Sequence, residues 1–232
     1  FWKHILSIVP AMLPAVALGI IAVRLHTFTG YAGVVIFYLS LLFHDPMYQM
    51  LALILDLVLL MAVYVFTYPK YNANQVMPAF FAVVYVGVML SYVYQTRMLD
   101  GGKFHVWLIF LCSWGCDTCA YCVGVLFGKH KMAPVLSPKK SVEGAVGGVV
   151  GAILLGIIYA AATKGGMVEY AIICGAGALI SMVGDLAASA IKRNQGIKDY
   201  GKLIPGHGGI LDRFDSVIFV APFAEFLFRI VF

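Results

Sequence analysis

Residues Met47 to Thr67 read MYQMLALILDLVLLMAVYVFT, an almost unbroken apolar run that contains one acid, Asp56. In a helix, about 20 such residues cross the roughly 30 Å hydrocarbon core of a bilayer. The rest of the chain is similar, since 62% of its 232 residues are hydrophobic and 12% are charged. Soluble domains have about 45–50% and 25%. This composition excludes a water-soluble fold and predicts an integral membrane protein.

Similar apolar segments lie on both sides of this run, separated by breaks such as His44-Asp45-Pro46 and Asp100-Gly101-Gly102. Residues of these types end helices and form turns. The pattern predicts an all-α, polytopic transmembrane bundle of about eight spans in a single domain, 1–232. The spans are expected at Ile5 to Val23, Tyr31 to Phe43, Met47 to Thr67, Met77 to Tyr94, His105 to Phe127, Val142 to Ala162, Glu169 to Ile191 and Phe214 to Phe232. Because the chain begins at Phe1, further residues are expected upstream.

Positive charge is distributed unevenly between the two ends of these spans. With eight spans, 11 of the 16 Lys and Arg residues fall on one side, mostly in the long loops 128–141 and 192–213. Basic residues accumulate in cytoplasmic loops. We therefore expect both loops in the cytoplasm and Phe1 on the outer side.

Several other features of the spans have structural interpretations. The Gly- and Ala-rich stretch from Gly144 to Gly156 predicts close helix packing. Glu225 and Arg229 are four residues apart and are expected to pair. Asp56 is expected to be a buried, hydrogen-bonded acid of unknown role. The cysteines between Cys112 and Cys122 are expected to pack within one span and not to bind metal.

The remaining acids form a pattern around the second long loop. Asp185, Ser189 and Lys192 are spaced to share one face of a helix that leads into this loop. Asp212 and Asp215, three residues apart, would share a face at the start of the last span. Such carboxylates, without His or Cys at ligand spacing, favour Mg²⁺ over zinc. An acid within a span, as Asp117 is, marks a candidate functional site.

Basic residues and glycines alternate with these acids, which suits a metal bound together with a polyphosphate. The turn Pro205-Gly206-His207-Gly208-Gly209 lets bare backbone approach a phosphate. In the first loop, Ser141 is a candidate N-cap for the next helix. The cations concerned are Lys192, Arg193, Lys198, Lys202 and Arg213, together with Lys139 and Lys140.

As one string, Ser189-x-Ile191-Lys192-Arg193-x4-Lys198-Asp199-x-Gly201-x2-Ile204-Pro205-x-His207-Gly208-Gly209-Ile210-x-Asp212-Arg213-x-Asp215 resembles the phosphatidate cytidylyltransferase signature. Asp117 and Ser137-Pro138-Lys139-Lys140 also resemble that family, so the resemblance covers roughly the C-terminal half. Family members often carry an acid directly before the signature serine, where this chain has Ala188. No ligand is therefore assigned at that position.

The resemblance implies a membrane enzyme that converts CTP and phosphatidate to CDP-diacylglycerol and pyrophosphate with Mg²⁺, with no nucleic-acid partner and a possible homodimer. Residues 101–232 would hold the catalytic spans, while spans within 1–100 have no assigned role. The expected catalytic residues are Asp185, Asp212, Asp215, Ser189, Lys192 and Arg193. The expected metal ligands are Asp185, Asp212, Asp215 and Asp117. The expected substrate-binding residues are Lys139, Lys140, Ser141, Lys198, Asp199, Lys202, His207, Gly208, Gly209 and Arg213.

Three other functions share parts of this pattern. A CTP-dependent polyprenol or phytol kinase, or a cytidylyltransferase for archaeal lipids, would use similar charges. An ion-coupled transporter would instead use Asp56, Asp117 and Asp185 as sites in the middle of the membrane. That alternative predicts acids spread across the bilayer, without a basic cluster at one face.

Overall fold

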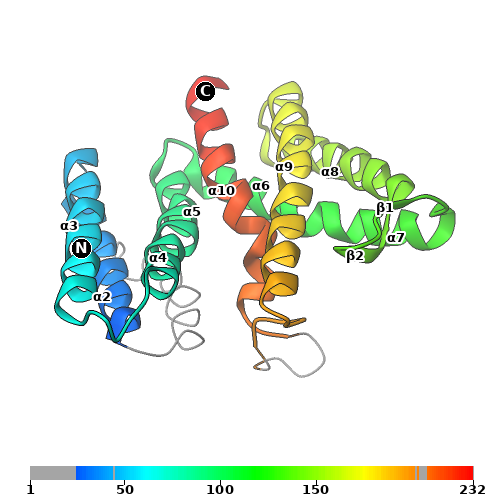
Figure 1. The fold of residues 1–232 in the computed structure, drawn as a ribbon. Helices are drawn as coiled ribbons and strands as arrows, with labels where there is room; N and C mark the ends of the chain where they lie inside the picture. Colours follow the sequence, from blue (N-terminus) through cyan, green and yellow to red (C-terminus); the bar gives the residue numbers. More distant parts are fainter. Residues whose placement is uncertain (1–24, 44, 202, 204–207, 232) are drawn as a thin grey trace. The chain divides into compact units, whose positions relative to one another are not determined.

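A computed structural model describes residues 25–43, 45–201, 203 and 208–231 and is mostly helical (Figure 1). Within this part of the chain, five helices are long and apolar enough to cross a membrane. The protein is therefore a polytopic membrane protein. The five helices are Pro46–Phe66, Ala73–Met98, Gly102–Phe127, Val142–Thr163 and Met167–Asn194.

Two further predicted spans are helical but are not among these five helices. The remaining one of the eight predicted spans lies outside the described residues. The apolar part of the Tyr31 to Phe43 span is a shorter helix, Phe28–Phe43. The segment predicted as the last span is the helix α10, Leu211–Val231, which is not one of these five. Its 21 residues include the pair formed by Glu225 and Arg229 that the sequence predicted. The predicted span Ile5 to Val23 lies outside the described residues.

The chain divides into two compact units, Phe1–Tyr94 and Gln95–Phe232. In the first unit, α2 (Leu25–Ser40) continues into the short helix η1 (Leu41–Phe43). The α2 helix packs against α3 (Pro46–Phe66), α4 (Ala73–Ala82) and the π-helical segment η2 (Val83–Val88). Asp45, in the predicted break before this span, caps α3 by accepting a 2.9 Å hydrogen bond from Met47 N. Helix α5 (Met89–Met98) continues from η2 across the boundary between the units.

Asp56 is buried on α3, but no described residue makes the expected hydrogen bond with it. Its side chain is packed against Gly33 of α2, and neither carboxylate oxygen has a hydrogen-bond partner in the described part of the chain. The prediction of burial is confirmed, and the prediction of a hydrogen bond is wrong. Glycine at position 33 leaves the space that the carboxylate fills, and none of the described side chains of α2 donates to it.

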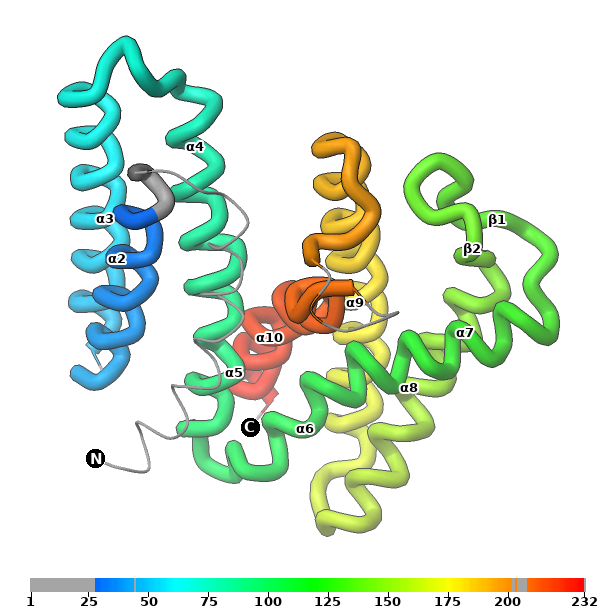
Figure 2. Tube along the Cα trace, turned by 90° about the horizontal axis from the view of Figure 1, so that it is seen from below, coloured from blue at the N-terminus to red at the C-terminus, as the bar shows by residue number. Residues whose placement is uncertain are grey.

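The second unit contains the remaining elements. Helix α6 (Gly102–Phe110) passes through a π-helical segment, η3 (Leu111–Gly115), into α7 (Cys116–Phe127). Helix α8 (Val142–Thr163) packs against α7 on one side and α9 (Met167–Asn194) on the other, and α9 packs against α10. Figure 2 shows α7 and α8 running side by side.

Small residues explain the close approach of α8 to its neighbours. Gly144, Gly148 and Gly156 are buried at intervals of four or eight residues. A Cβ atom at position 148 would lie 2.9 Å from the Ala120 Cβ of α7, and one at position 156 would lie 3.0 Å from the Tyr170 carbonyl of α9. The predicted close packing is confirmed. The opposite face of α8 carries exposed aliphatic residues, as expected for a lipid-facing surface.

An all-α prediction implies that the loop 128–141 is irregular, but this loop contains a β-hairpin. Strands β1 (Lys131–Ala133) and β2 (Ser137–Ser141) pair antiparallel, with Lys131 opposite Ser141. Glu143, in the first turn of α8, accepts hydrogen bonds from the backbone N–H groups of Lys129 and His130. Ser141 caps α8 through the predicted bond from Gly144 N, 3.2 Å long. The hairpin is therefore fastened to the start of α8.

The second long loop is shorter than predicted. Lys192 and Arg193 belong to α9, which continues to Asn194, and Asp212 and Arg213 belong to α10. The connection between the helices is thus 195–210, of which 195–201, 203 and 208–210 are described. Side-chain bonds to Lys192 and Asp212, set out below, hold both helix ends in place.

Candidate active site

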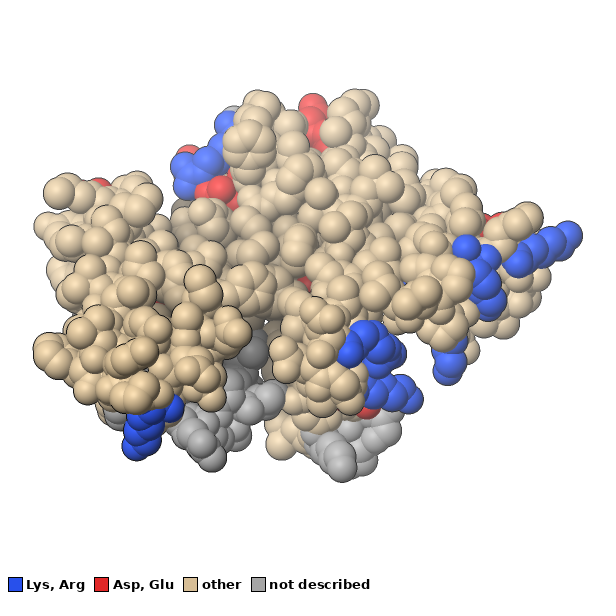
Figure 3. All heavy atoms as spheres, viewed as in Figure 1, with Lys and Arg blue, Asp and Glu red and all other residues tan. Residues whose placement is uncertain are grey.

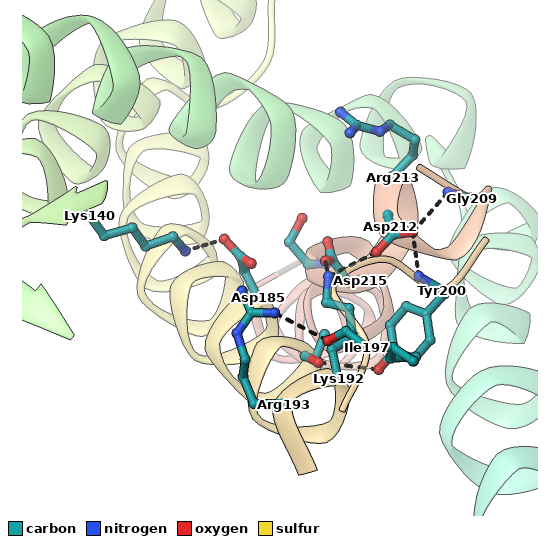
Figure 4. Close-up of polar contacts among 12 residues, drawn as sticks. Lys140, Asp185, Lys192, Arg193, Ile197, Tyr200, Gly209, Asp212, Arg213 and Asp215 are labelled. Atoms are coloured by element: carbon teal, nitrogen blue, oxygen red, sulfur yellow. Dashed lines mark hydrogen bonds and ion pairs between the residues drawn. The ribbon is translucent and has the colours of Figure 1, made fainter. Parts of the chain in front are cut away.

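Two helices carry the acids and bases of the signature segment. Asp185, Ser189 and Lys192 follow one side of α9 toward its C-terminal end, and Asp212 and Asp215 lie in the first turns of α10. The helices pack against each other. Figure 4 shows Lys192 of α9 pointing toward Asp212 and Asp215 of α10, and Asp185 of α9 pointing toward Lys140.

The ammonium group of Lys192 joins the two helices. Its Nζ donates a 2.8 Å hydrogen bond to Asp212 Oδ1 and lies 3.8 Å from Asp215 Oδ2. The side chains of Lys192, Asp212 and Asp215 are only 10%, 5% and 11% exposed. Buried charges are stable only when oppositely charged groups and hydrogen bonds compensate for lost water. Each of these three groups therefore depends on the others.

Asp212 also fastens the connecting loop. Its Oδ2 accepts hydrogen bonds from Tyr200 N, at 2.9 Å, and Gly209 N, at 2.8 Å. Gly208 has a φ of +84°, which favours glycine. A Cβ atom there would lie 2.9 Å from the same carboxylate oxygen. The glycines of the predicted turn thus let the loop close around Asp212.

Tyr200, which the sequence did not single out, makes a cation–π contact with the ammonium group of Lys192. Lys192 Nζ lies 5.2 Å from the centre of the Tyr200 ring, and the phenol donates a 3.3 Å hydrogen bond to the Ala188 carbonyl. Burial raises the pKa of Tyr200 to about 12, and the nearby charges of Asp215 and Asp212 act in the same direction. The phenol is therefore neutral at physiological pH, and its ring faces the cation.

Asp185 links α9 to the hairpin. It forms an ion pair with Lys140 of β2, and the two side chains are 23% and 27% exposed. Lys140 thus comes from the first long loop and Asp185 from the helix that precedes the second one. The pair therefore joins the hairpin of the first long loop to α9 (Figure 4).

Asp117, at the start of α7, is close enough to interact electrostatically with Asp185 and Lys140, and it hydrogen-bonds with Ser216 of α10. Ser216 also shares a 2.5 Å hydrogen bond with Ser113 of η3. The charges of Asp185 and Asp117 in turn act on Asp215. Helices α7, α9 and α10 therefore each contribute one acid to a single negative region. A π-helical segment directly before Asp117 changes the helix phase there, as often occurs at functional sites.

Three of the four predicted metal ligands fit a divalent cation in type and charge. Asp117, Asp185 and Asp215 offer hard oxygen donors and repel one another unless cations are present. Asp212 differs, because three N–H donors already occupy its oxygens. Among the described side chains, no three acids, histidines or cysteines converge as a preformed metal-binding group.

A pocket of about 530 Å³ opens beside this acidic region, between α7, the hairpin, α8 and α9. Both acids and bases line it: Asp117 and Asp185 together with Lys139 and Lys140. Figure 3 shows Lys and Arg side chains gathered around the hairpin and the loop end of α9. The pocket can therefore take an anion next to the acids that suit a metal.

The other predicted site residues are exposed or lie outside the described chain. Arg193 is exposed and donates a 3.1 Å hydrogen bond to the Ile197 carbonyl. Lys198 and Asp199 are exposed on the loop, and Arg213 is exposed on α10. Lys202 and His207 are outside the described residues. The roles assigned to all these residues stay predictions.

Sequence reasoning missed three residues of the site: Lys131, which lines the pocket, Tyr200, and Trp114, whose Nε1 donates a 2.9 Å hydrogen bond to the Arg213 carbonyl. Lys131 could have been found as a third cation near Lys139 and Lys140. Tyr200 and Trp114 carry no signal in the sequence, because their roles arise from contacts between distant segments.

The sequence was also compared with known protein families and with known proteins. The model of the cytidylyltransferase family matches residues 6–231. The chain is 40% identical over 148 residues to a phosphatidate cytidylyltransferase from Staphylococcus saprophyticus and 42% identical over 149 residues to one from Staphylococcus epidermidis. Each alignment covers 63% of this chain and 56% of the relative. The chain thus spans little more than half the length of these relatives.

Proposed function

Because the chain belongs to the cytidylyltransferase family, we propose that it transfers a cytidylyl group from CTP to phosphatidate, forming CDP-diacylglycerol and pyrophosphate. The observation that carries this proposal is the buried arrangement of Lys192 with Asp212 and Asp215, close to the pocket where Lys140 pairs with Asp185. The relatives' names give the same activity for those proteins.

In this reaction, an oxygen of the lipid phosphate attacks the α-phosphorus of CTP and pyrophosphate leaves. The nucleophile is already an anion, since a phosphomonoester carries about −1.5 to −2 charges near neutral pH. The barrier therefore comes mainly from bringing two anions together, and it is lowered by positioning and charge neutralisation. We assign this task to Lys140, Lys192 and Arg193, with Lys139, Lys198, Lys202 and Arg213 as further phosphate contacts.

Asp117, Asp185 and Asp215 are the residues that would hold Mg²⁺. When bound, Mg²⁺ neutralises phosphate oxygens and helps orient them. Asp212 would instead keep Lys192 and the connecting loop in position, because its oxygens already accept three N–H bonds. Ser189, one turn beyond Asp185 on α9, would donate a hydrogen bond to a phosphate oxygen.

The membrane arrangement follows from the charge distribution. The basic hairpin and the 195–210 loop would face the cytoplasm, where CTP is available. Eight spans and assembly as a homodimer are further predictions of the same proposal.

The direct test is to incubate the purified protein with labelled CTP, phosphatidate and Mg²⁺ and to extract the lipid. A labelled lipid should form together with pyrophosphate, and a chelator should abolish its formation. Release of CDP instead of pyrophosphate would identify a CTP-dependent lipid kinase. Absence of any CTP-dependent, chelator-sensitive lipid product would refute the proposal.

A further inference from the structure

The pocket beside Asp185 has two kinds of wall. One wall is cationic and consists of Lys131 from β1 and Lys139 and Lys140 from β2. The other wall is largely apolar and includes Tyr121 and Val125 of α7. A ligand with a charged head and an apolar body matches such a combination better than a fully polar one does.

The apolar wall continues onto the membrane-facing surface. Tyr121 and Val125 lie on the membrane-spanning helix Gly102–Phe127, and their exposed fractions are 73% and 67%. Leu126 and Phe127, next along the same helix, are 73% and 64% exposed. Part of the pocket lining therefore belongs to an exposed apolar surface of a membrane-spanning helix, which lipid chains would cover.

The cations of the pocket differ in their availability. Lys140 is paired with Asp185. Among the described residues, Lys131 and Lys139 form no ion pair with a carboxylate. Lys131 lies on β1 and Lys139 on β2, and both residues are exposed. Two unpaired cations on the edge of a half-apolar pocket are suited to a phosphate group carrying two negative charges.

The hairpin that carries these cations is held firmly. Val142 N donates a 2.9 Å hydrogen bond to the His130 carbonyl, and Glu143 bonds the His130 ring at 2.6 Å. Glu143 also accepts from the backbone N–H of Lys129 at 3.0 Å. Lys131 therefore extends from a fixed strand at the edge of the pocket. Lys129 is two residues away on the same fastened segment but does not line the pocket.

We propose that this pocket is the subsite for the phosphatidate head group, with Lys131 and Lys139 as the phosphate contacts and the α7 surface at Tyr121 and Val125 as the path of the acyl chains. This inference rests on the proposed function and adds a residue, Lys131, that lies outside the signature segment. The lipid phosphate would then sit beside Asp117 and Asp185, while CTP approaches from Lys192 and Arg193.

The test compares Lys131→Gln with Lys129→Gln, which removes the same charge outside the pocket. In mixed micelles, Lys131→Gln should raise the KM for phosphatidate about tenfold, since a charge-assisted phosphate contact is lost. The KM for CTP should change less than about twofold, and Lys129→Gln should leave both near the wild-type values. A rise confined to the KM for CTP, or no change in either, would overturn the assignment.

A steric pair of variants tests the acyl path. Val125→Trp would fill the pocket mouth, whereas Val150→Trp adds the same ring to an exposed position on α8, outside the pocket. Only Val125→Trp should raise the KM for phosphatidate. Equal effects of the two variants would count against a lipid path along α7.

Direct binding separates this inference from the proposed function. Equilibrium binding of dioctanoyl phosphatidate, compared with dioctanoyl phosphatidylcholine, should be weakened by Lys131→Gln and not by Lys129→Gln. If no CTP-dependent product forms but this dependence is found, the proposed function fails and the lipid subsite stands. If a product forms and binding does not depend on Lys131, the subsite is wrong and the function stands.

Discussion

At the scale of single residues, Asp212 is the most connected group of the site. It accepts bonds from Lys192, Tyr200 and Gly209, which lie on α9 and at two points of the connecting loop. The side chains of Asp212 and Lys192 are 5% and 10% exposed. A single carboxylate therefore sets both the position of a cation and the closure of the loop.

We predict that Asp212→Asn lowers CTP-dependent turnover at least about a hundredfold, because removing one partner of a buried ion pair costs about 3–5 kcal/mol. It should also lower the thermal midpoint of the detergent-solubilised protein. Asp100→Asn, which changes an exposed acid in the turn before α6, is the control and should have neither effect. Wild-type turnover in Asp212→Asn would show that the bonds from Lys192, Tyr200 and Gly209 to the Asp212 carboxylate are not needed for activity.

Tyr200 allows the ring and the hydroxyl to be tested separately. We predict that Tyr200→Phe keeps most of the turnover, since the ring below Lys192 remains and only a 3.3 Å hydrogen bond is lost. Tyr200→Leu should lose about three- to thirtyfold, as expected for a cation–π contact of about 0.5–2 kcal/mol. Equal losses in both variants would mean that the hydroxyl matters and the ring does not.

The pH dependence gives a second measurement on the same residue. Burial raises the pKa of Tyr200 to about 12, so its phenol keeps its proton at every pH where the enzyme would be assayed. The pH profiles of Tyr200→Phe and of the wild-type protein should therefore coincide up to about pH 10, the ordinary pKa of tyrosine. A shoulder between pH 7 and 10 that disappears in Tyr200→Phe would contradict the neutral phenol.

At the scale of elements, apolar runs predicted the helices well, because hydrophobic length alone identifies a span. The run Met47 to Thr67 corresponds to α3, and Val142 to Ala162 corresponds to α8. The hairpin was not predicted, because Ser137-Pro138-Lys139-Lys140 has little strand propensity and forms a strand through bonds to β1 and α8. The signature segment predicted which residues meet, whereas the separate role of Asp212 depends on tertiary bonds that sequence spacing does not encode.

The close contact between α7 and α8 is expected to hold Asp117 in place, and a substitution at this contact can test that expectation. We predict that Gly148→Ala lowers the thermal midpoint and turnover, because its Cβ would lie 3.0 Å from the Cys116 carbonyl, next to Asp117. Such overpacking typically costs about 1–3 kcal/mol. Gly175→Ala on α9 is the matched control, since its Cβ would meet only side-chain atoms of Ile153, at 3.2 Å, and no backbone atom. Equal tolerance of both substitutions would show that α7 and α8 can separate without moving the site.

At the scale of the whole molecule, the proposed topology places the two ends of α8 on opposite sides of the membrane. This helix has 22 residues, Val142–Thr163, and is therefore about 33 Å long, enough to cross the hydrocarbon core. Its first turn holds the basic hairpin through Glu143 and Lys129, and Lys164 follows its last residue. The proposed cytoplasmic site requires the hairpin end to face the cytoplasm and Lys164 to face the other side.

We predict that Lys129→Cys and Lys164→Cys react with a membrane-impermeant maleimide from opposite sides. Both would be made in a Cys122→Ser background, because Cys122 is the exposed native cysteine among the described residues. In intact cells, Lys164→Cys should be labelled and Lys129→Cys should not, since basic hairpins stay in the cytoplasm. Permeabilised cells should label both, which shows that each thiol is reactive. Labelling of Lys129→Cys in intact cells would show that the topology is the reverse of the proposed one. The site would then lie on the face where CTP is absent, and the proposed reaction could not occur there.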